Sequence, residues 1–357
     1  MNKYTPFLKF KANEIGALKL LKKEELCSIT PFFDLATKKD ITSDDIENTI
    51  TKGVRKFELN FSDCNGFYID DYDLEDTHMI NGDIVYKFII DTYSSLPYIP
   101  VIGLDRSEER TDVLLEPSIK SEILALRFTE EDFSSYAICE DDISELIELL
   151  FNNDETSFNK LHLIIDCRVC RNADVSTIST QISKFISEIS SDYNFEKIIV
   201  TGSSISSNYV ENVETDQRKT IQRSECEIFE QVSLHLEADA LPLEIGDYTV
   251  ITPEYSDVSI PVTALRKVMT PKVVYSYDTA QYFLRGKAME SHPDGAGQYD
   301  TLCDELINLP FFRGKPYSKG DAYLVQKANH IGNNAQPGFM NKHLINAHIT
   351  YMLKGYS

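Results

Sequence analysis

The sequence of 357 residues has no hydrophobic run that approaches the roughly 18 consecutive apolar residues of a membrane-spanning helix. Its first residues, MNKYTPFLKFKANEIGAL, also lack the apolar core and the small-residue cleavage site of a secretory signal peptide. These two absences argue against a membrane protein and against secretion by this route. We therefore expect a cytoplasmic protein that makes no contact with a membrane.

Cysteines are few, odd in number and scattered, at positions 27, 64, 139, 167, 170, 226 and 303. Such a set does not form the disulfide framework of a small secreted domain and agrees with a reducing compartment. Cys167 and Cys170 form a C-x-x-C motif in the run LHLIIDCRVCR. No second C-x-x-C or closely spaced histidine pair accompanies it, and Cys167 lies within the apolar run. We expect buried structural cysteines, with a metal or redox site as the minor alternative.

Basic residues are outnumbered, with 35 Lys and Arg against 57 Asp and Glu, which gives a net charge of −22. This surplus of negative charge repels phosphate backbones at long range, so direct nucleic-acid binding is disfavoured. Two interpretations of the acidity remain open. The acids form either an ordinary solvated surface or a face that meets a basic protein partner.

Short apolar runs rich in Ile, Val, Leu and Phe recur along the chain, with amphipathic helical patterns between them. The runs predict strands at residues 28–35, 56–63, 98–105, 122–129, 161–168, 197–204, 243–250 and 272–279. The clearest helical patterns span residues 43–56, 142–153 and 175–190. The last pattern places these residues on one helical face: Ile178, Ile182, Phe185, Ile186 and Ile189.

Strands that are apolar throughout are typical of parallel strands covered on both faces by helices. Eight such units predict a (β/α)8 TIM-like barrel, and an open doubly wound α/β sheet is the alternative. No Gly-x-Gly-x-x-Gly follows the first strand, which disfavours a dinucleotide-binding sheet. We expect a barrel over residues 27–289, a strand and helix extension over 1–26, and a C-terminal tail over 290–357. The tail is too small for a core of its own, so we expect it to pack on the barrel in one structural domain.

Polar residues stand at the ends of most expected strands, namely Asp34, Asn60, Asp63, Asp105, Arg127, Asp166, Arg168 and Asp247. The carboxyl ends of barrel strands build the site in this fold, so these side chains could line one polar pocket. They could equally be helix caps and salt bridges that support loops. Asp166 and Arg168 are two residues apart, should project to the same side of their strand, and are the first candidates for the pocket.

Two further segments carry weaker signals. Residues 71–82, DYDLEDTHMING, resemble a calcium-binding loop but have Asp76 and Gly82 where that loop needs Gly and Glu. We expect an acidic surface loop there. Residues 201–206, TGSSIS, could cradle a phosphate or form a plain strand-to-helix turn. The chain has no G-x-S-x-G elbow and no pattern that indicates a metal or a cofactor, so we expect neither.

Several motifs in fixed order resemble the "beta protein" family, named after the beta protein of a satellite coliphage. They are YTPFLKFKANEIGAL (4–18), ITPFFDL (29–35), RSE (223–225), GDY (246–248), FLRG (283–286), FRGKPYSKGD (312–321) and NAHIT (346–350). The chain departs from the family pattern in having no tryptophan and in having Ala347 where the family has the first histidine of a pair. The resemblance adds to the candidate pocket Arg223, Glu225, Arg285, Asp321 and His348.

What the resemblance implies is a context rather than a reaction. The satellite-phage gene lies in a small antiviral cassette beside a toxic neighbour that it restrains, and no reaction or cofactor follows for the family. Our leading hypothesis is therefore a component of a bacterial or prophage-borne anti-phage defence cassette. It would bind and restrain a toxin or nuclease from the same cassette, as an antitoxin-like protein or as a sensor.

The alternative is a TIM-barrel hydrolase, phosphodiesterase-like, or a binding protein for a phosphorylated or nucleotide-like small molecule. Acids at the barrel mouth would then serve as general acid and base, and arginines would hold an anion. A subunit that forms homo-oligomers through its tail is a third hypothesis. The lack of a complete catalytic signature favours the first.

Overall fold

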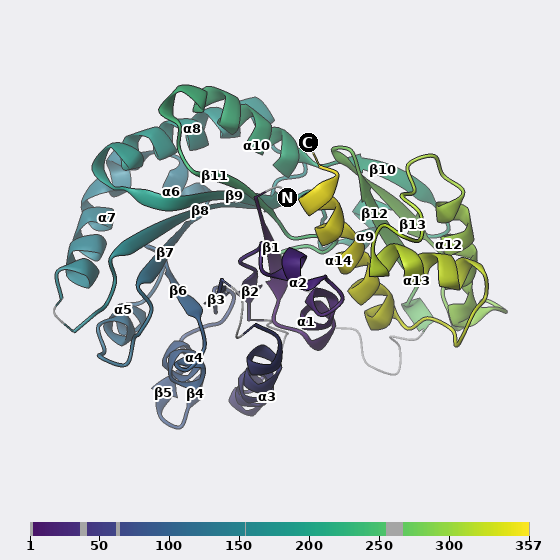
Figure 1. Ribbon diagram of the computed structural model, residues 1–357, viewed down its shortest axis with the longest axis horizontal. Coiled ribbons are helices and arrows are strands. Elements are labelled where there is room, and N and C mark those ends of the chain that lie inside the picture. Colours follow the sequence, from purple (N-terminus) through teal and green to yellow (C-terminus); the bar gives the residue numbers. More distant parts are fainter. Residues whose placement is uncertain (1–2, 36–40, 62–64, 154, 255–266, 357) are drawn as a thin grey trace.

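Eight parallel strands close into a barrel in the computed structural model, which describes residues 3–35, 41–61, 65–153, 155–254 and 267–356 (Figure 1). The order around the barrel is β1-β11-β9-β8-β7-β6-β3-β2. The TIM-like barrel is thus confirmed, and the open-sheet alternative is excluded. The bounds of the strands are β1 Tyr4–Lys9, β2 Phe32–Asp34, β3 Phe67–Asp70, β6 Tyr98–Ile102, β7 Ile123–Phe128, β8 Lys160–Val169, β9 Phe195–Ser203 and β11 Leu243–Asp247.

Helices surround the barrel and bury its outer face (Figure 1). They are α3 (Ser43–Phe61), α4 (Val85–Tyr93), α5 (Glu108–Leu114), α6 (Glu130–Phe133), α7 (Tyr136–Phe151), α8 (Val175–Asp192) and α10 (Ser224–His235). The short α9 (Tyr209–Asn212) lies instead against two strands of a second sheet, β12 (Lys272–Tyr277) and β13 (Ala280–Arg285) (Figure 1). The three expected helices thus correspond to α3, α7 and α8, and the predicted apolar face of α8 is buried. A short hairpin, β4 (Met79–Ile80) and β5 (Asp83–Ile84), precedes α4, and a 3-10 turn at Glu237–Asp239 follows α10.

Two strand assignments were wrong. Residues 56–61 continue α3, because Ile46, Ile50 and Phe57 recur at helical spacing on its buried face and no breaker interrupts them; residues 62–63 lie outside the described chain. The second barrel strand expected at residues 56–63 is instead β3, which begins at Phe67 after the end of α3. Residues 272–277 form a strand, β12, but it lies outside the barrel.

The N-terminal strand occupies the barrel position that was assigned to β12. Every residue of β1 is buried, and β1 pairs in parallel with β11 on one side and β2 on the other. The expected extension over residues 1–26 is therefore wrong in this respect, because β1 closes the barrel. The sheet needs a strand between β2 and β11, and an apolar N-terminal segment supplies it.

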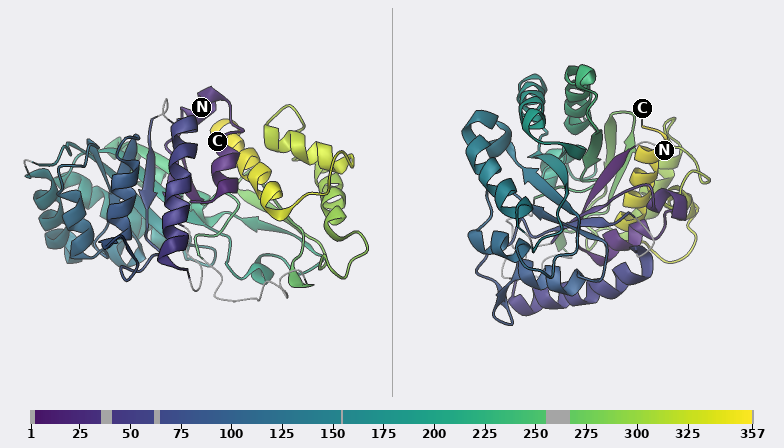
Figure 2. Two further views of the ribbon diagram at one scale, coloured as in Figure 1. Left: turned by 90° about the horizontal axis from the view of Figure 1, so that it is seen from below. Right: turned by 60° about the vertical axis from the view of Figure 1, so that its left-hand side comes forward.

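A second sheet packs beside the barrel together with the C-terminal helices (Figure 2). Its three antiparallel strands lie in the order β10-β13-β12, with bounds Arg218–Gln222, Ala280–Arg285 and Lys272–Tyr277. Helices α12 (Gln298–Ile307), α13 (Lys319–Ala328) and α14 (Pro337–Lys354) follow, with a 3-10 turn at Gly295–Gly297 before them. Since β10 precedes α10 in the chain, residues 27–289 are not all barrel. Helix α14 contacts α1 (Ala12–Leu18), β1 and β12, and a short α2 (Lys23–Leu26) leads from α1 towards β2.

The core has two parts, as a barrel requires. Rings and aliphatic side chains from inward-facing strand positions fill the barrel, and Phe7 stacks on Phe32 with ring centroids 4.4 Å apart. A larger cluster lies between the strands and the surrounding helices. Across the described ranges, the helices are all too short or too polar to span a bilayer.

Glu14 ties α1 to the end of β1 and should make folding depend on pH. It is 6% exposed and accepts a hydrogen bond from the backbone N–H of Lys9, and burial raises its pKa to about 7. An unfolded glutamate ionises near pH 4.5. The folded state therefore binds the proton more tightly than the unfolded state does. The stability that protonated Glu14 contributes is fully present below pH 4.5 and is lost as the pH rises through about 7.

We expect Glu14→Gln, which keeps the hydrogen-bond acceptor, to flatten this dependence. Between pH 5 and pH 8 its free energy of unfolding should fall less than that of the wild type, by roughly 2 kcal/mol. Urea unfolding followed by circular dichroism measures the difference. Glu24→Gln, at a side chain that is 70% exposed, is the control. Parallel curves for Glu14→Gln and wild type would contradict the assignment.

Candidate functional site at the barrel mouth

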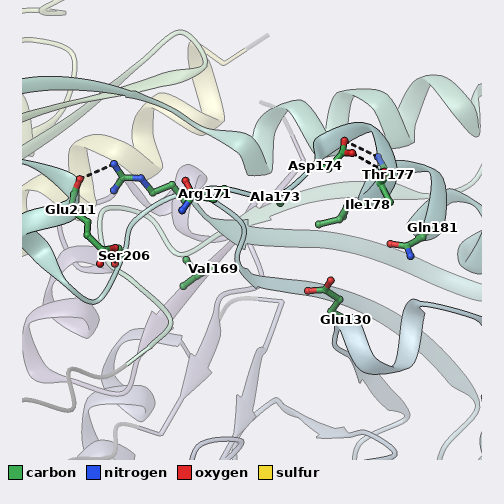
Figure 3. Close-up of a pocket in the computed structure, with 11 residues that line it drawn as sticks. Glu130, Val169, Arg171, Ala173, Asp174, Thr177, Ile178, Gln181, Ser206 and Glu211 are labelled. Carbon is green, nitrogen blue, oxygen red and sulfur yellow. Dashed lines mark hydrogen bonds between the residues drawn. The ribbon is translucent and has the colours of Figure 1, made fainter.

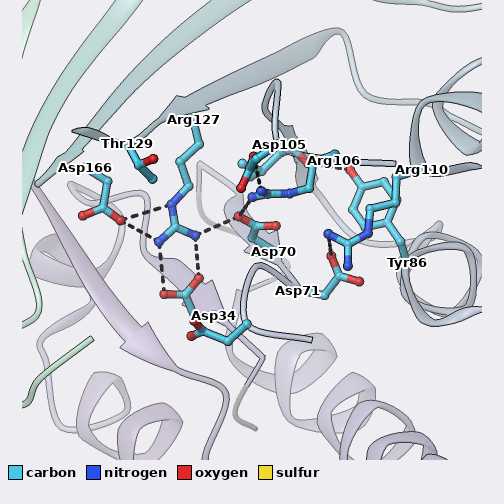
Figure 4. A network of polar contacts seen from close by, with 12 residues as sticks. Asp34, Asp70, Asp71, Tyr86, Asp105, Arg106, Arg110, Arg127, Thr129 and Asp166 are labelled. Carbon is cyan, nitrogen blue, oxygen red and sulfur yellow. Dashed lines mark hydrogen bonds and ion pairs between the residues drawn. The ribbon is translucent and has the colours of Figure 1, made fainter. Parts of the chain in front are cut away.

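The buried guanidinium of Arg127 is the centre of the carboxyl end of the barrel (Figure 4). Arg127 is the penultimate residue of β7, and its Nη atoms lie 2.7 Å from Asp34, 2.8 Å from Asp70 and 2.6 Å from Asp166. These three carboxylates stand at the ends of β2 and β3 and within β8. The Tyr248 hydroxyl, just after β11, accepts from Arg127 at 2.9 Å and donates to Asp166 at 2.6 Å. One cation thus joins the ends of five strands.

An aromatic ring covers this network. The ring centroid of Tyr72, in the loop after β3, lies 4.6 Å from the guanidinium carbon of Arg127, 4.7 Å from that of Arg106 and 4.6 Å from that of Arg168. Cations over an aromatic face are attracted by the negative charge of that face. Three arginines therefore hold Tyr72 across the mouth, and the Arg127 side chain has no exposure to solvent.

A second ring of ion pairs surrounds the first. Arg106 binds Asp70 at 3.0 Å and also contacts Asp105. The segment 71–82 supplies the other carboxylates, at Asp71 and Asp76 for Arg110 and at Asp73 for Arg168. Asp71 is 1% exposed, so the expectation of an acidic surface loop was wrong for the first part of this segment. Ion pairs with Arg110 and Arg168 hold the acids of this segment at the mouth.

Burial raises the pKa of some of these acids, and ion pairing lowers the pKa of another. Burial raises the pKa of Asp34 to about 6, against the opposing effect of Arg127, and raises the pKa of Asp71 to about 7. Burial also acts on Asp70, but Arg106 and Arg127 outweigh it and lower its pKa. Asp71 can therefore hold a proton near neutral pH, whereas Asp34 takes one up only in mildly acidic solution and pairs with Arg127 as a carboxylate at neutral pH. Among the described residues, no group of three or more acids, cysteines and histidines is arranged to hold a metal ion.

Asp166 and Arg168 do not continue a regular strand together. Arg168 has φ of 50°, and the pairing of β8 with β9 shifts register between Asp166 and Val169. The backbone N–H of Arg168 donates to Asp166 at 2.8 Å within this bulge. As a result, Asp166 faces Arg127 while Arg168 reaches Tyr72 and Asp73.

A separate buried network lies at the end of β11, around Asp247. Asp247 accepts a hydrogen bond from Tyr4 at 2.6 Å, pairs with Arg223, and lies 2.9 Å from Nε2 of His348. Arg223 also binds Glu225 at 2.9 Å. Burial raises the pKa of Asp247, but His348 and Arg223 outweigh it and hold the pKa at about 2. This network joins β1, β11, α10 and α14.

A line of Ser276, His348 and Asp247 contains the three residue types of a hydrolase triad, but the two histidine nitrogens are exchanged. Nδ1 of His348 lies 2.7 Å from the Ser276 hydroxyl and Nε2 faces Asp247, whereas in the triad the serine bonds Nε2 and the aspartate bonds Nδ1. All three side chains are buried, with exposed fractions of 2%, 1% and 1%. A nucleophile must reach its substrate, so we assign this line to docking α14 and β12 onto the barrel. Only the second position of the family's histidine pair takes part, and Ala347 packs at the first.

The structure thus divides the residues expected in one pocket among three places. Arg285 and Asp321 lie apart from both networks. Arg285 donates to Thr270 and to the backbone oxygen of Val213, and Asp321 accepts from Tyr275. Asp105 stands at the rim of the mouth with a half-exposed side chain. The mouth holds Asp34, Arg127, Asp166 and Arg168, and the Asp247 network holds Arg223, Glu225, Asp247 and His348. Asn60 is part of the last turn of α3, and Asp63 lies outside the described residues.

Sequence reasoning missed the residues that complete the mouth. The run FYID (67–70) is a short apolar stretch that ends in an acid, the same signal that identified Asp34, and it would have identified Asp70. Tyr72 and Arg106 lie in loops after strand ends, Arg110 lies in α5, and no local pattern marks any of them. Their partners come from other parts of the barrel, so only the closed barrel brings them together.

A pocket of about 410 Å³ opens beside the mouth, between the loops that follow β8 and β9 (Figure 3). Three of the charged groups that line it, those of Arg171, Asp174 and Glu211, are already engaged. Arg171 donates to Asn212 and to the backbone oxygen of Glu211, and Asp174 caps α8. The serines of TGSSIS are also committed, because Ser204 donates to Glu225 and Ser206 donates to Glu211. The segment is built as a hydrogen-bonded turn rather than an open anion cradle.

The C-x-x-C cysteines are buried, and their thiols are unpaired with each other. Burial raises the pKa of the Cys167 and Cys170 thiols, which disfavours the thiolate that metal binding and redox chemistry need. A side chain at Gly202 would contact both, with Cys170 Sγ only 3.1 Å from its Cβ. These cysteines pack β8 against β9, as the sequence predicted.

The fold and the mouth define a TIM-like barrel whose carboxyl end is closed by an arginine and carboxylate network. The chain belongs to the Beta protein family, whose model matches residues 4–354. A search of curated proteins finds no match in sequence.

Two solved structures show a distant likeness. One is an alanine racemase from Clostridium difficile 630 in complex with cycloserine, with a TM-score of 0.36 and 11% identity, over 77% of this chain and 58% of that one. The other is a diaminopimelate decarboxylase from M. jannaschi, with a TM-score of 0.39 and 10% identity, over 69% of this chain and 54% of that one. The chain spans little more than half the length of either protein. At this level of similarity neither reaction transfers to it.

Arg127 should be essential to folding because three buried carboxylates depend on it. Replacing it by methionine leaves Asp34, Asp70 and Asp166 without their shared cation, and breaking a buried ion pair in this way costs about 3–5 kcal/mol. We expect Arg127→Met to lower the free energy of unfolding by that order in urea titration. Arg127→Lys should fall between, because an ammonium lacks the fork that reaches several carboxylates.

The exposed Arg55 on α3 provides the matched control. Arg55→Met should remain within about 0.5 kcal/mol of wild type. An Arg127→Met protein as stable as Arg55→Met would show that the mouth network is not what holds the strand ends together.

Proposed function

We propose that this protein works by binding another protein, as a component of a bacterial or prophage-borne anti-phage defence cassette. Its partner would be a toxin or nuclease encoded in the same cassette, which it restrains until infection. Membership of the Beta protein family supports this proposal, since the satellite-phage protein that gave the family its name lies beside a toxic neighbour. The partner surface can be argued from the charge distribution of the chain.

The observation that carries the proposal is the outer face of α7. No lysine or arginine occurs between Phe128 and Asn159, the segment that includes α6 and α7. The acidic side chains of α7 are exposed, and no described base pairs with them; they are Glu140, Asp141, Asp142, Glu145 and Glu148. Figure 1 places α7 on the side of the barrel away from the second sheet. Within the part of the chain that the structure describes, these acids are therefore without ion pairs, and the face is strongly negative.

Two apolar side chains are exposed on the same helix. Ile138 is 81% exposed and Leu149 is 47% exposed. An interface typically combines apolar contacts that exclude water with charges that steer the partner and set specificity. A basic protein surface with an apolar centre fits this combination. We therefore assign the proposed partner surface to the α7 face, defined by Ile138, Leu149 and the five acids above.

The closed mouth supports binding over catalysis. In this fold the substrate reaches the carboxyl ends of the strands. Here Arg127 fills that position with its three carboxylates, and Tyr72 covers it. A hydrolase or a phosphate-binding protein that uses the mouth would have to break this network first. The alternative function therefore has less support at this site.

Charge reversal on α7 tests the proposal. We expect the triple variant Asp141→Lys, Glu145→Lys, Glu148→Lys to lose both pull-down of the neighbouring gene product and rescue of growth when the two are co-expressed. Binding by the wild type should weaken as the salt concentration rises, because the attraction between exposed charges is screened. Since the three side chains are exposed, the variant should fold normally.

The matched control carries the same change of charge on exposed acids of α10 and the 3-10 turn after it. Its substitutions are Glu227→Lys, Glu237→Lys and Asp239→Lys. It should bind and rescue as the wild type does. Equal loss in both triple variants would show that net charge alone matters. Absence of binding and of rescue with the wild type would overturn the proposed function itself.

A further inference from the structure

Two cations share one aromatic ring at the junction between the barrel and the second sheet. The Lys272 ammonium, at the start of β12, lies 3.5 Å from the ring centroid of Tyr209, and the Arg285 guanidinium carbon, at the end of β13, lies 5.6 Å from it. Arg285 donates to Thr270 and to the backbone oxygen of Val213. Within the described ranges, neither cation has a carboxylate partner. In a chain with a net charge of −22, such an uncompensated pair is unexpected.

This arrangement is costly without a counter-ion. Burial, together with the positive charge of the neighbouring Arg285, lowers the pKa of Lys272 to about 8. Taking a charge out of water is unfavourable unless a charge of opposite sign and hydrogen bonds replace the solvent. The Tyr209 ring offsets part of this desolvation cost, since a cation over a ring is attracted to it. A bound anion would offset the remainder.

A cavity of about 230 Å³ lies directly beside Lys272. It is bordered by the loops after β9 and β11, by β12 and by α14, so its walls come from both the barrel and the second sheet. Clefts between such units are common ligand sites. Val250, Val274 and Leu344 form its apolar side.

Two polar side chains with unused hydrogen-bond donors line this cavity, in addition to Lys272 and the Tyr209 ring beneath it. Oγ1 of Thr252 accepts from the backbone N–H of Glu254, which leaves the hydroxyl hydrogen to donate, and the exposed amide of Asn341 completes the set. The nearby acids are at the rim, where Glu211 and Glu254 accept from Ser206 and Ser207. The interior therefore offers donors and positive charge.

We propose that this cavity binds a phosphate monoester, with Lys272 supplying the charge from its place over the Tyr209 ring, and with Thr252 and Asn341 donating hydrogen bonds to the phosphate oxygens. A phosphate presents three acceptor oxygens and close to two negative charges, which matches several donors from different elements better than a carboxylate does. The organic part of the ligand lies along Val250, Val274 and Leu344. The bound ligand would join the barrel to the second sheet, and the site is independent of the proposed partner surface on α7.

Binding of inorganic phosphate and of butyl phosphate to the full chain tests this site. Isothermal titration calorimetry, with chloride at matched ionic strength as the reference, should show saturable binding of both, and butyl phosphate should bind more tightly because its tail reaches the apolar wall. Both ligands should raise the melting temperature, because they bind the folded state only. Binding should involve one site per chain.

Lys272→Met keeps the aliphatic stem and removes the charge, and we expect it to weaken phosphate binding at least tenfold, the usual effect of losing a charged hydrogen bond. Without phosphate its melting temperature should equal or exceed that of the wild type, because a half-buried charge without a carboxylate partner is gone. Lys272→Arg should retain binding. Lys219→Met, at an exposed lysine on β10 of the same sheet, is the control and should bind like the wild type.

Failure of both ligands to bind beyond the chloride reference would overturn the site. Equal binding by Lys272→Met and Lys219→Met would overturn it as well. Neither result bears on the α7 face, since pull-down and rescue by the α7 variants are measured without phosphate. The two proposals can therefore fail separately.

Discussion

The burial of Arg127 is the constraint on which the barrel mouth depends. A guanidinium without solvent contact needs negative charge and hydrogen bonds close to it, and here Asp34, Asp70 and Asp166 supply both. Because each carboxylate stands on a different strand, the requirement of one side chain fixes the relative positions of β2, β3, β7 and β8. The same requirement explains why the mouth is closed. The acids that a catalyst would direct at a substrate are directed here at an arginine of the chain itself.

The Asp247 network extends this principle to the second sheet. Asp247 is held by Tyr4 from the first barrel strand, by Arg223 from the start of α10 and by His348 from the last helix. The residues that mark the chain as a family member therefore include those that attach its C-terminal part to the barrel. In this interpretation, the family motifs maintain an architecture, and the surfaces and the junction cavity around it are left to serve recognition.

The sequence predicted much of the fold because each buried element has its own periodic signal. The α8 pattern at Ile178, Ile182 and Phe185 and the apolar run of β8 are local, so they can be identified without knowing their partners. The misassigned strands show the limit of this reasoning. The residues after Lys56 are as apolar as a strand, and it is the burial of Phe57 on the inner face of α3, with Leu59 exposed, that distinguishes the helix from a strand. Likewise β1 and β12 are similar apolar runs, and competition for one place in the barrel decides between them.

The sequence by itself determined an acidic α/β chain with polar strand ends, buried cysteines at Cys167 and Cys170 and a family resemblance along its length. Only the tertiary structure decided which polar ends meet. Asp34 and Asp166 are far apart in the chain and meet at Arg127, whereas Arg285 and Asp321 lie elsewhere. Ion pairs and rings such as Tyr72 over Arg127 depend on distances of a few ångströms between strands. Such distances are set by barrel closure, and closure is a property of all eight strands together.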